Sequence, residues 1–125
     1  MDYLLVALGG GVGASARYGL GGWLTNRYGA GFPIGTLLVN LSGALLIGLL
    51  FTYLTEQMVT DPLWRRLLII GFLGGYTTFS SYTYEAFLLA EQGHWGRAAT
   101  YVIGSNVIGL AACVAGVALA RLALR

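Results

Sequence analysis

The sequence predicts an all-α membrane protein, a single domain of four transmembrane helices over residues 1–125. Two observations carry this prediction. Charged residues make up 10% of the chain and hydrophobic residues 57%, whereas about 25% of an ordinary soluble domain is charged. Four apolar segments also reach the roughly 20 residues that cross a bilayer as a helix. They are residues 3–24, 33–54, 67–90 and 99–120.

The first segment combines closely spaced small residues with one arginine. Gly9 and Gly13 are four residues apart, a spacing that lets another helix approach closely. Gly9, Gly11 and Ala14 imitate a dinucleotide-binding fingerprint, but no strand–helix–strand context accompanies them. Arg17 lies inside the apolar stretch, where a charge must reach the interface, pair or face water. We expect it either to extend to the membrane surface or to attract anions.

The second and fourth segments each carry a polar stripe. Thr36 and Asn40 are four residues apart and share a helix face. The Asn40 amide must find partners within hydrocarbon, and two roles remain open for it, a clamp between helices or a donor that lines a pore. Tyr101, Ser105 and Gly109 repeat the four-residue spacing in the last segment.

The third segment contains the run GGYTTFSSY at residues 74–82. A glycine pair followed by hydroxyl residues predicts a break in the helix, and in hydrocarbon the freed backbone groups must face protein, an ion or water. Phe79 and Tyr82 share a face if the helix resumes there. Glu85, one turn after Ser81, either anchors the helix end or titrates. Broken helices at membrane depth mark ion sites in many transporters.

The arginines outside the apolar segments lie on both predicted sides of the membrane. With four spans, one side holds Arg65, Arg66, Arg121 and Arg125, and the other holds Arg27 and Arg97. Because this bias is small, the positive-inside rule sets no single orientation, and we expect insertion in both. Two-fold pairing is the commonest way for a small chain to oligomerise, so an antiparallel homodimer is predicted.

The connections between segments offer little chemistry. Asp61 and Pro62 predict a turn followed by a helix start. His94 is a lone loop histidine beside Gly93 and Trp95, and no base faces a plausible nucleophile, so we expect no enzyme activity. Cys113 is the single cysteine and can form no internal disulfide. With a net charge of only +2, no nucleic-acid partner is expected.

Three motifs together resemble the Fluc, or CrcB, family of bacterial and archaeal fluoride channels. They are GGGVGASARY at residues 9–18, GTLLVNLSGALLIG at 35–48 and GFLGGYTTFSSY at 71–82. Each is weak alone, but their order in a chain of this size is specific. The resemblance implies a passive channel that exports cytoplasmic fluoride. It also implies an antiparallel, dual-topology homodimer. Each chain would cross a prokaryotic inner membrane several times, with lipid around the dimer.

The resemblance also assigns site residues. The fluoride pathway would contain Arg17, Thr36, Asn40, Phe79, Tyr82, Tyr101 and Ser105. The backbone carbonyls of Gly74 and Thr77 would hold a structural sodium ion at the dimer interface. Two positions depart from the family pattern. Tyr82 stands where the family usually has phenylalanine, and Gly109 stands where a further hydroxyl often extends the polar track.

Two other functions compete with the channel. A small multidrug transporter is another four-helix chain that can assemble antiparallel, and it exports organic cations in exchange for protons. That mechanism needs a central carboxylate, normally in the first helix, but residues 3–24 contain none and Glu85 is the only carboxylate in the spans. A structural membrane subunit without transport activity would leave the polar stripes and the predicted break unexplained.

Overall fold

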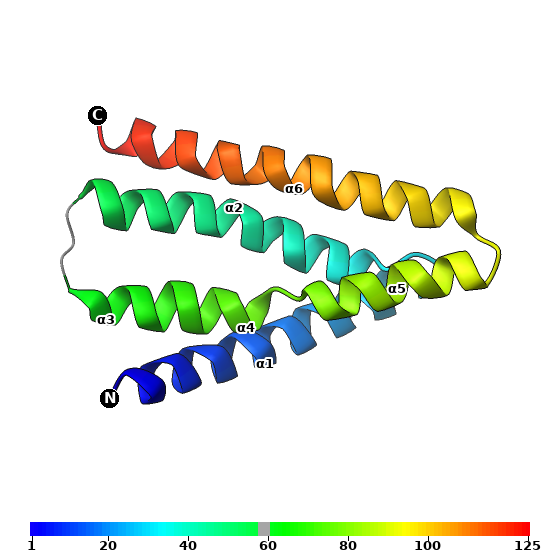
Figure 1. Cartoon of the computed structure of the whole chain (residues 1–125), viewed down its shortest axis with the longest axis horizontal. Coiled ribbons are helices and arrows are strands. Elements are labelled where there is room, and N and C mark those ends of the chain that lie inside the picture. Colours follow the sequence, from blue (N-terminus) through cyan, green and yellow to red (C-terminus); the bar gives the residue numbers. More distant parts are fainter. Residues whose placement is uncertain (58–60) are drawn as a thin grey trace.

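The computed structural model describes residues 1–57 and 61–125, and all regular structure in this part of the chain is helical (Figure 1). The elements are α1 (Asp2–Tyr28), α2 (Ile34–Glu56), α3 (Pro62–Trp64), the π-helix η1 (Arg65–Leu73), α4 (Gly74–Tyr76), α5 (Phe79–Glu91) and α6 (Trp95–Ala123). The prediction of an all-α fold is therefore confirmed. Both termini lie at one end of an elongated molecule, and the α5–α6 turn lies at the other (Figure 1).

Helices α1, α2 and α6 extend beyond the predicted apolar segments. Helix α1 continues to Tyr28 and α6 begins at Trp95. The segments were predicted from apolar residues alone, whereas helical hydrogen bonds also continue through the polar residues at their ends. The helix start at Asp61 and Pro62 is confirmed, since the Asp61 carboxylate accepts from the Leu63 N–H at 2.9 Å and Pro62 occupies the first turn. Residues 58–60 of the predicted connection lie outside the described part.

Within the described residues, two helices are long and apolar enough to cross a bilayer, α2 and α6. The sequence predicted four such spans. Helix α1 is rich in glycine, which lowers its mean hydropathy, and the third segment is divided into shorter pieces. Neither is long and apolar enough as one helix, so the four-span arrangement stays a prediction.

Glycine residues allow the helices to pack backbone to backbone. Gly9 and Gly13 lie against η1 so closely that a Cβ on Gly13 would collide with the Phe72 carbonyl. Gly48 of α2 and Gly116 of α6 make the same kind of contact with each other's helices. The interpretation of Gly9 and Gly13 as a close-packing surface is therefore confirmed, and the same small-residue rule joins α2 to α6.

The third segment is interrupted, but after the glycine pair rather than at it. Gly74 has helical dihedrals (φ −61°, ψ −38°), and helix α4 runs through both glycines. Thr77 (φ −83°, ψ 156°) and Thr78 (φ −146°, ψ 115°) are extended. Helix α5 then begins at Phe79, where the Thr78 hydroxyl caps it by accepting from the Ser81 N–H at 3.2 Å. Such a cap satisfies one of the N–H groups at the new helix start.

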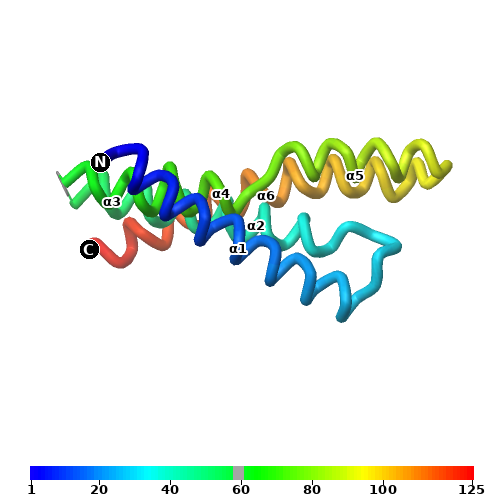
Figure 2. Tube along the Cα trace, turned by 90° about the horizontal axis from the view of Figure 1, so that it is seen from below, coloured from blue at the N-terminus to red at the C-terminus, as the bar shows by residue number. Residues whose placement is uncertain are grey.

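The interruption lies near the middle of the molecule. Beyond it, α5 runs beside α6, whereas the end of α1 and the beginning of α2 diverge from this pair (Figure 2). The region around Thr77 and Thr78 is therefore where four helical segments meet. It is also where the predicted site residues gather.

Candidate ion pathway

Asn40 of α2 binds the backbone of the interruption at two points. Its Nδ2 donates to the Thr78 carbonyl at 2.9 Å, and its Oδ1 accepts from the Thr78 N–H at 2.8 Å. The amide thus satisfies both backbone groups of one extended residue, as buried groups in an apolar setting require. Of the two roles left open for Asn40, the structure shows the clamp between helices.

This clamp frees a carbonyl group. In an uninterrupted helix the Thr78 N–H would donate to the Gly74 carbonyl, but here it donates to Asn40 instead. The next carbonyl, that of Gly75, accepts from Arg17 Nε of α1 at 3.1 Å. Arg17 is therefore paired within the chain, because it satisfies a backbone group at the interruption.

Glu85 of α5 joins two predicted pathway residues. Its carboxylate accepts from the Thr36 hydroxyl at 2.7 Å and from the Tyr101 hydroxyl at 2.8 Å, one donor on each oxygen. Tyr101 is fully buried, and its ring packs edge-on against Phe32 at a centroid distance of 5.5 Å. The contact between Glu85 and both hydroxyls was not predicted, because only the fold brings the three segments together.

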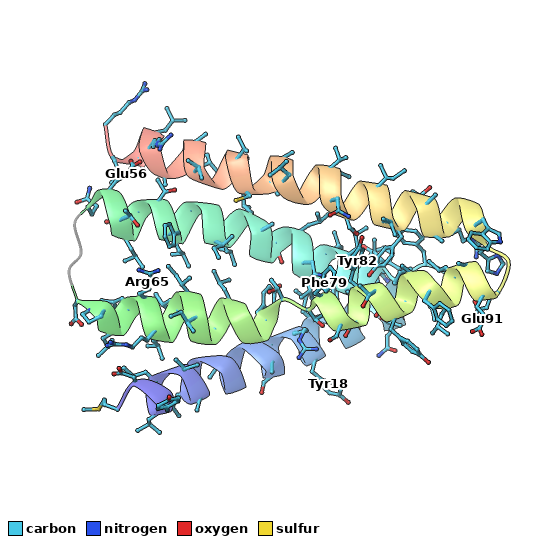
Figure 3. The ribbon with its side chains drawn as sticks, viewed as in Figure 1. Tyr18, Glu56, Arg65, Phe79, Tyr82 and Glu91 are labelled. Carbon is cyan, nitrogen blue, oxygen red and sulfur yellow. The ribbon has the colours of Figure 1, made fainter. Side chains whose placement is uncertain are left out.

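Three aromatic rings follow one another from the interruption toward α6. Phe79 and Tyr82 have ring centroids 5.7 Å apart, and Tyr82 and Tyr101 have centroids 5.2 Å apart. Figure 3 shows Phe79 and Tyr82 at the start of α5, near the middle of the molecule. Phe79 is 77% exposed, so it presents its ring to whatever lies outside the chain.

Ser105 is one turn beyond Tyr101 on α6. Its Oγ is buried, and among the residues that the structure describes it has no hydrogen-bond partner. A buried hydroxyl without a partner is costly, and such a group calls for a specific explanation, such as a bound water or ion.

Tyr76 and Ser42 form a further contact that sequence reasoning missed. The Tyr76 hydroxyl and Ser42 Oγ are 2.8 Å apart, and Ser42 also donates to the Val39 carbonyl at 3.0 Å. Tyr76 is buried and stacks on Phe72. The last helical residue before the interruption is therefore fastened to α2, two residues before the Asn40 clamp. In the sequence, the position of Ser42 two residues after Asn40 was the signal that could have indicated this contact.

In the part of the chain that the structure describes, three grooves adjoin the interruption. The first, of about 430 Å³, is lined by residues that include Asn40, Gly74, Thr77 and Phe79. The second, of about 330 Å³, includes Arg17, Thr36, Thr78 and Ser81. The third, of about 390 Å³, includes Phe79, Tyr82 and Asn106. Every predicted site residue except Tyr101 and Ser105 lines one of these grooves, and Tyr101 reaches Thr36 through Glu85.

Comparison with known proteins identifies the family. The family model described as "CrcB-like protein, Camphor Resistance (CrcB)" matches residues 4–117. The "Fluoride-specific ion channel FluC" of Solibacter usitatus is 51% identical over 121 residues, which cover 97% of this chain and 99% of the relative. The protein of the same name from Koribacter versatilis is 48% identical and covers 96% and 95%. That from Coxiella burnetii (strain Dugway 5J108-111) is 49% identical and covers 93% and 91%.

These relatives are named as ion channels, so the family consists of membrane proteins rather than enzymes. The expectation of no enzyme activity is confirmed on that ground. The match also extends over nearly the whole chain, as the three sequence motifs predicted. The chain belongs to the CrcB family.

Proposed function

We propose that this protein is a fluoride-selective passive channel that exports cytoplasmic fluoride across a prokaryotic inner membrane. One observation carries the proposal: proteins named fluoride-specific ion channels match nearly the whole chain at about half identity. The same names favour the channel over the multidrug exporter. Passive export needs no coupling carboxylate and no nucleotide site, because the membrane potential and the fluoride gradient drive the ion.

The donors beside the interruption suit this ion. Fluoride is small and strongly hydrated, so a pathway must replace its water donors at short range. Ser105 supplies a buried hydroxyl with no partner among the described residues, and Phe79 offers the positive edge of its ring. Arg17 lines the groove of about 330 Å³ and adds a positive charge there. In this proposal, Thr36, Asn40, Tyr82 and Tyr101 complete the pathway.

We further propose that the functional unit is an antiparallel homodimer with four spans per chain. The face around the interruption supports this, because Phe79 is 77% exposed and the adjoining groove is lined by Ile47, Ile69 and Ile70 as well as by Asn40. Polar backbone at membrane depth must be covered by protein or line a water-filled cavity. A second copy would cover this groove, and lipid would surround the outer faces.

A sodium ion held by the Gly74 and Thr77 carbonyls is part of this proposal. The residues fit such an ion, since sodium is a hard cation that prefers oxygen ligands. The Thr78 N–H is directed to Asn40 and away from the Gly74 carbonyl. Gly74 and Thr77 both line the groove that a second copy would cover. When bound, the ion would hold two chains together. Within each chain, the hydrogen bonds from Asn40 to Thr78 and between Tyr76 and Ser42 hold the backbone of residues 74–78 in place.

The test is fluoride efflux from liposomes that contain the purified protein, followed with a fluoride electrode. Chloride-loaded vesicles test selectivity, and protein-free vesicles give the leak. Rapid loss of fluoride with little loss of chloride is the expected result. Folded protein that passes no fluoride in sodium-containing buffer would refute the channel function. Melting temperature in detergent, measured in sodium and in N-methylglucamine buffers, tests the ion separately, and equal values would count against the sodium site.

A further inference from the structure

A second asparagine, Asn106 of α6, lies beside the aromatic residues of the pathway and has no part in the function proposed above. Its Nδ2 donates to the Tyr82 hydroxyl oxygen at 2.9 Å and to the Val102 carbonyl at 2.8 Å. A carbonyl oxygen can only accept, so the contact with Val102 identifies the amide nitrogen, which could otherwise be confused with its oxygen. The Tyr82 oxygen is therefore the acceptor in its bond with Asn106.

Because Tyr82 accepts from Asn106, its own hydroxyl hydrogen is left for another partner. A phenol carries one such hydrogen, and in residues 1–57 and 61–125 the Tyr82 hydroxyl has no hydrogen-bond partner besides the Asn106 amide, which donates to it. The ring is held in place between Phe79 and Tyr101, whose centroids lie 5.7 Å and 5.2 Å away. The hydroxyl thus has a fixed position and an uncommitted hydrogen.

The groove of about 390 Å³ beside this hydroxyl has few other donors. It is lined by Phe79, Tyr82, Thr83, Ala86, Val102 and Asn106. The Thr83 hydroxyl donates to the carbonyls of Phe79 and Ser80 at 3.1 Å and 3.0 Å, and both amide hydrogens of Asn106 are engaged. Among the described lining residues, Tyr82 alone has a side-chain polar hydrogen that is free to meet a ligand.

We propose that Tyr82 binds a permeating anion through its hydroxyl, and that Asn106 is a positioning residue that directs the hydroxyl hydrogen into the groove. The ligand is a small, strongly hydrated anion, for which the hydroxyl replaces one water. A hydrogen bond to an ion is roughly twice as strong as one between neutral groups, so a single donor is significant. The proposal rests on the channel function and extends it to a donor that a phenylalanine at this position would lack.

The test measures initial fluoride efflux over a range of fluoride concentrations for the wild type, Tyr82→Phe, Asn106→Leu and the double variant. Tyr82→Phe keeps the ring and removes the donor. It should lower flux at low fluoride about tenfold and raise the half-saturating concentration, with an unchanged melting temperature. Asn106→Leu keeps a similar volume and should have a smaller effect in the same direction. Adding it to Tyr82→Phe should change nothing further, since the two residues act as one unit.

Tyr84→Phe is the matched control, because it removes a hydroxyl from an exposed tyrosine of the same helix outside the groove, and its flux should equal that of the wild type. Equal half-saturation in the wild type and Tyr82→Phe would overturn the proposal. A further loss when Asn106→Leu joins Tyr82→Phe would also overturn it, since Asn106 would then act elsewhere. Absence of flux in the folded wild type would refute the channel function itself.

Discussion

Glycine allows close helix packing both at the α2–α6 contact and in the divided third segment, but only in the third segment is the helix interrupted. In the first, Gly48 and Gly116 let two continuous helices touch backbone to backbone. In the third segment, Gly75 makes a similar close contact with Gly10 of α1, and the helix continues through it. The opening comes at Thr77 and Thr78 instead. Glycine therefore sets how closely two helices approach, whereas a polar side chain from a neighbouring helix stabilises the opening.

The largest expected effect comes from filling the α2–α6 contact. In Gly116→Leu, the new side chain would collide with the backbone carbonyl of Leu45. The backbone of a packed helix cannot shift to another rotamer, as a side chain could. We expect a loss of stability of about 3 kcal/mol or more, measured as a lower melting temperature and poor recovery of folded protein. Gly104→Ala is the control on the same helix, because a Cβ there meets nothing within 4 Å. Equal stability of the two variants would show that the contact is not tight.

The next effect concerns the opening rather than the packing. In Asn40→Asp, the carboxylate keeps an acceptor for the Thr78 N–H but loses the donor to the Thr78 carbonyl, and it adds a negative charge beside an anion path. Fluoride efflux should fall at least tenfold, while size-exclusion chromatography shows the same oligomer. Efflux at the wild-type level would remove Asn40 from the pathway.

A smaller effect is expected at Phe79, because its ring is mostly exposed and supports little of the fold. Phe79→Ile removes the positive ring edge but keeps an apolar side chain. Efflux should fall several-fold, in keeping with the roughly 1 kcal/mol of specific aromatic contacts, and the melting temperature should not change. Phe87→Ile, at another exposed phenylalanine of α5, serves as the control. If both variants conduct as the wild type does, the Phe79 ring contributes packing alone.

The smallest effect lies at the end of the molecule that holds the termini. Arg121 Nε donates to Glu56 at 2.8 Å, and both side chains are exposed. Arg121→Gln should change the free energy of unfolding by less than about 1 kcal/mol and leave efflux unchanged. Arg125→Gln, also at the C-terminal end, is the comparison. A loss at Arg121 well above that at Arg125 would mean that this exposed ion pair contributes measurably to holding α2 and α6 together.

Sequence reasoning predicted the helices better than the interruption. Apolar length and glycine spacing depend on neighbours in the chain, so they indicated the segments and the close-packing role of Gly9 and Gly13. The position of the opening was placed too early, on the glycine pair. Both glycines stay helical, and at Gly75 the missing side chain permits the close contact with Gly10 of α1.

The amino-acid sequence alone was sufficient for the all-α fold class and the family, because these follow from composition, periodicity and motif order. Tertiary structure decided how the predicted site residues are paired. Asn40 binds a backbone 38 residues away, and Arg17 binds one 58 residues away. Such partners depend on the relative rotation and depth of packed helices, which no local pattern specifies. The same reason explains why the Glu85 and Asn106 contacts appeared only in the folded chain.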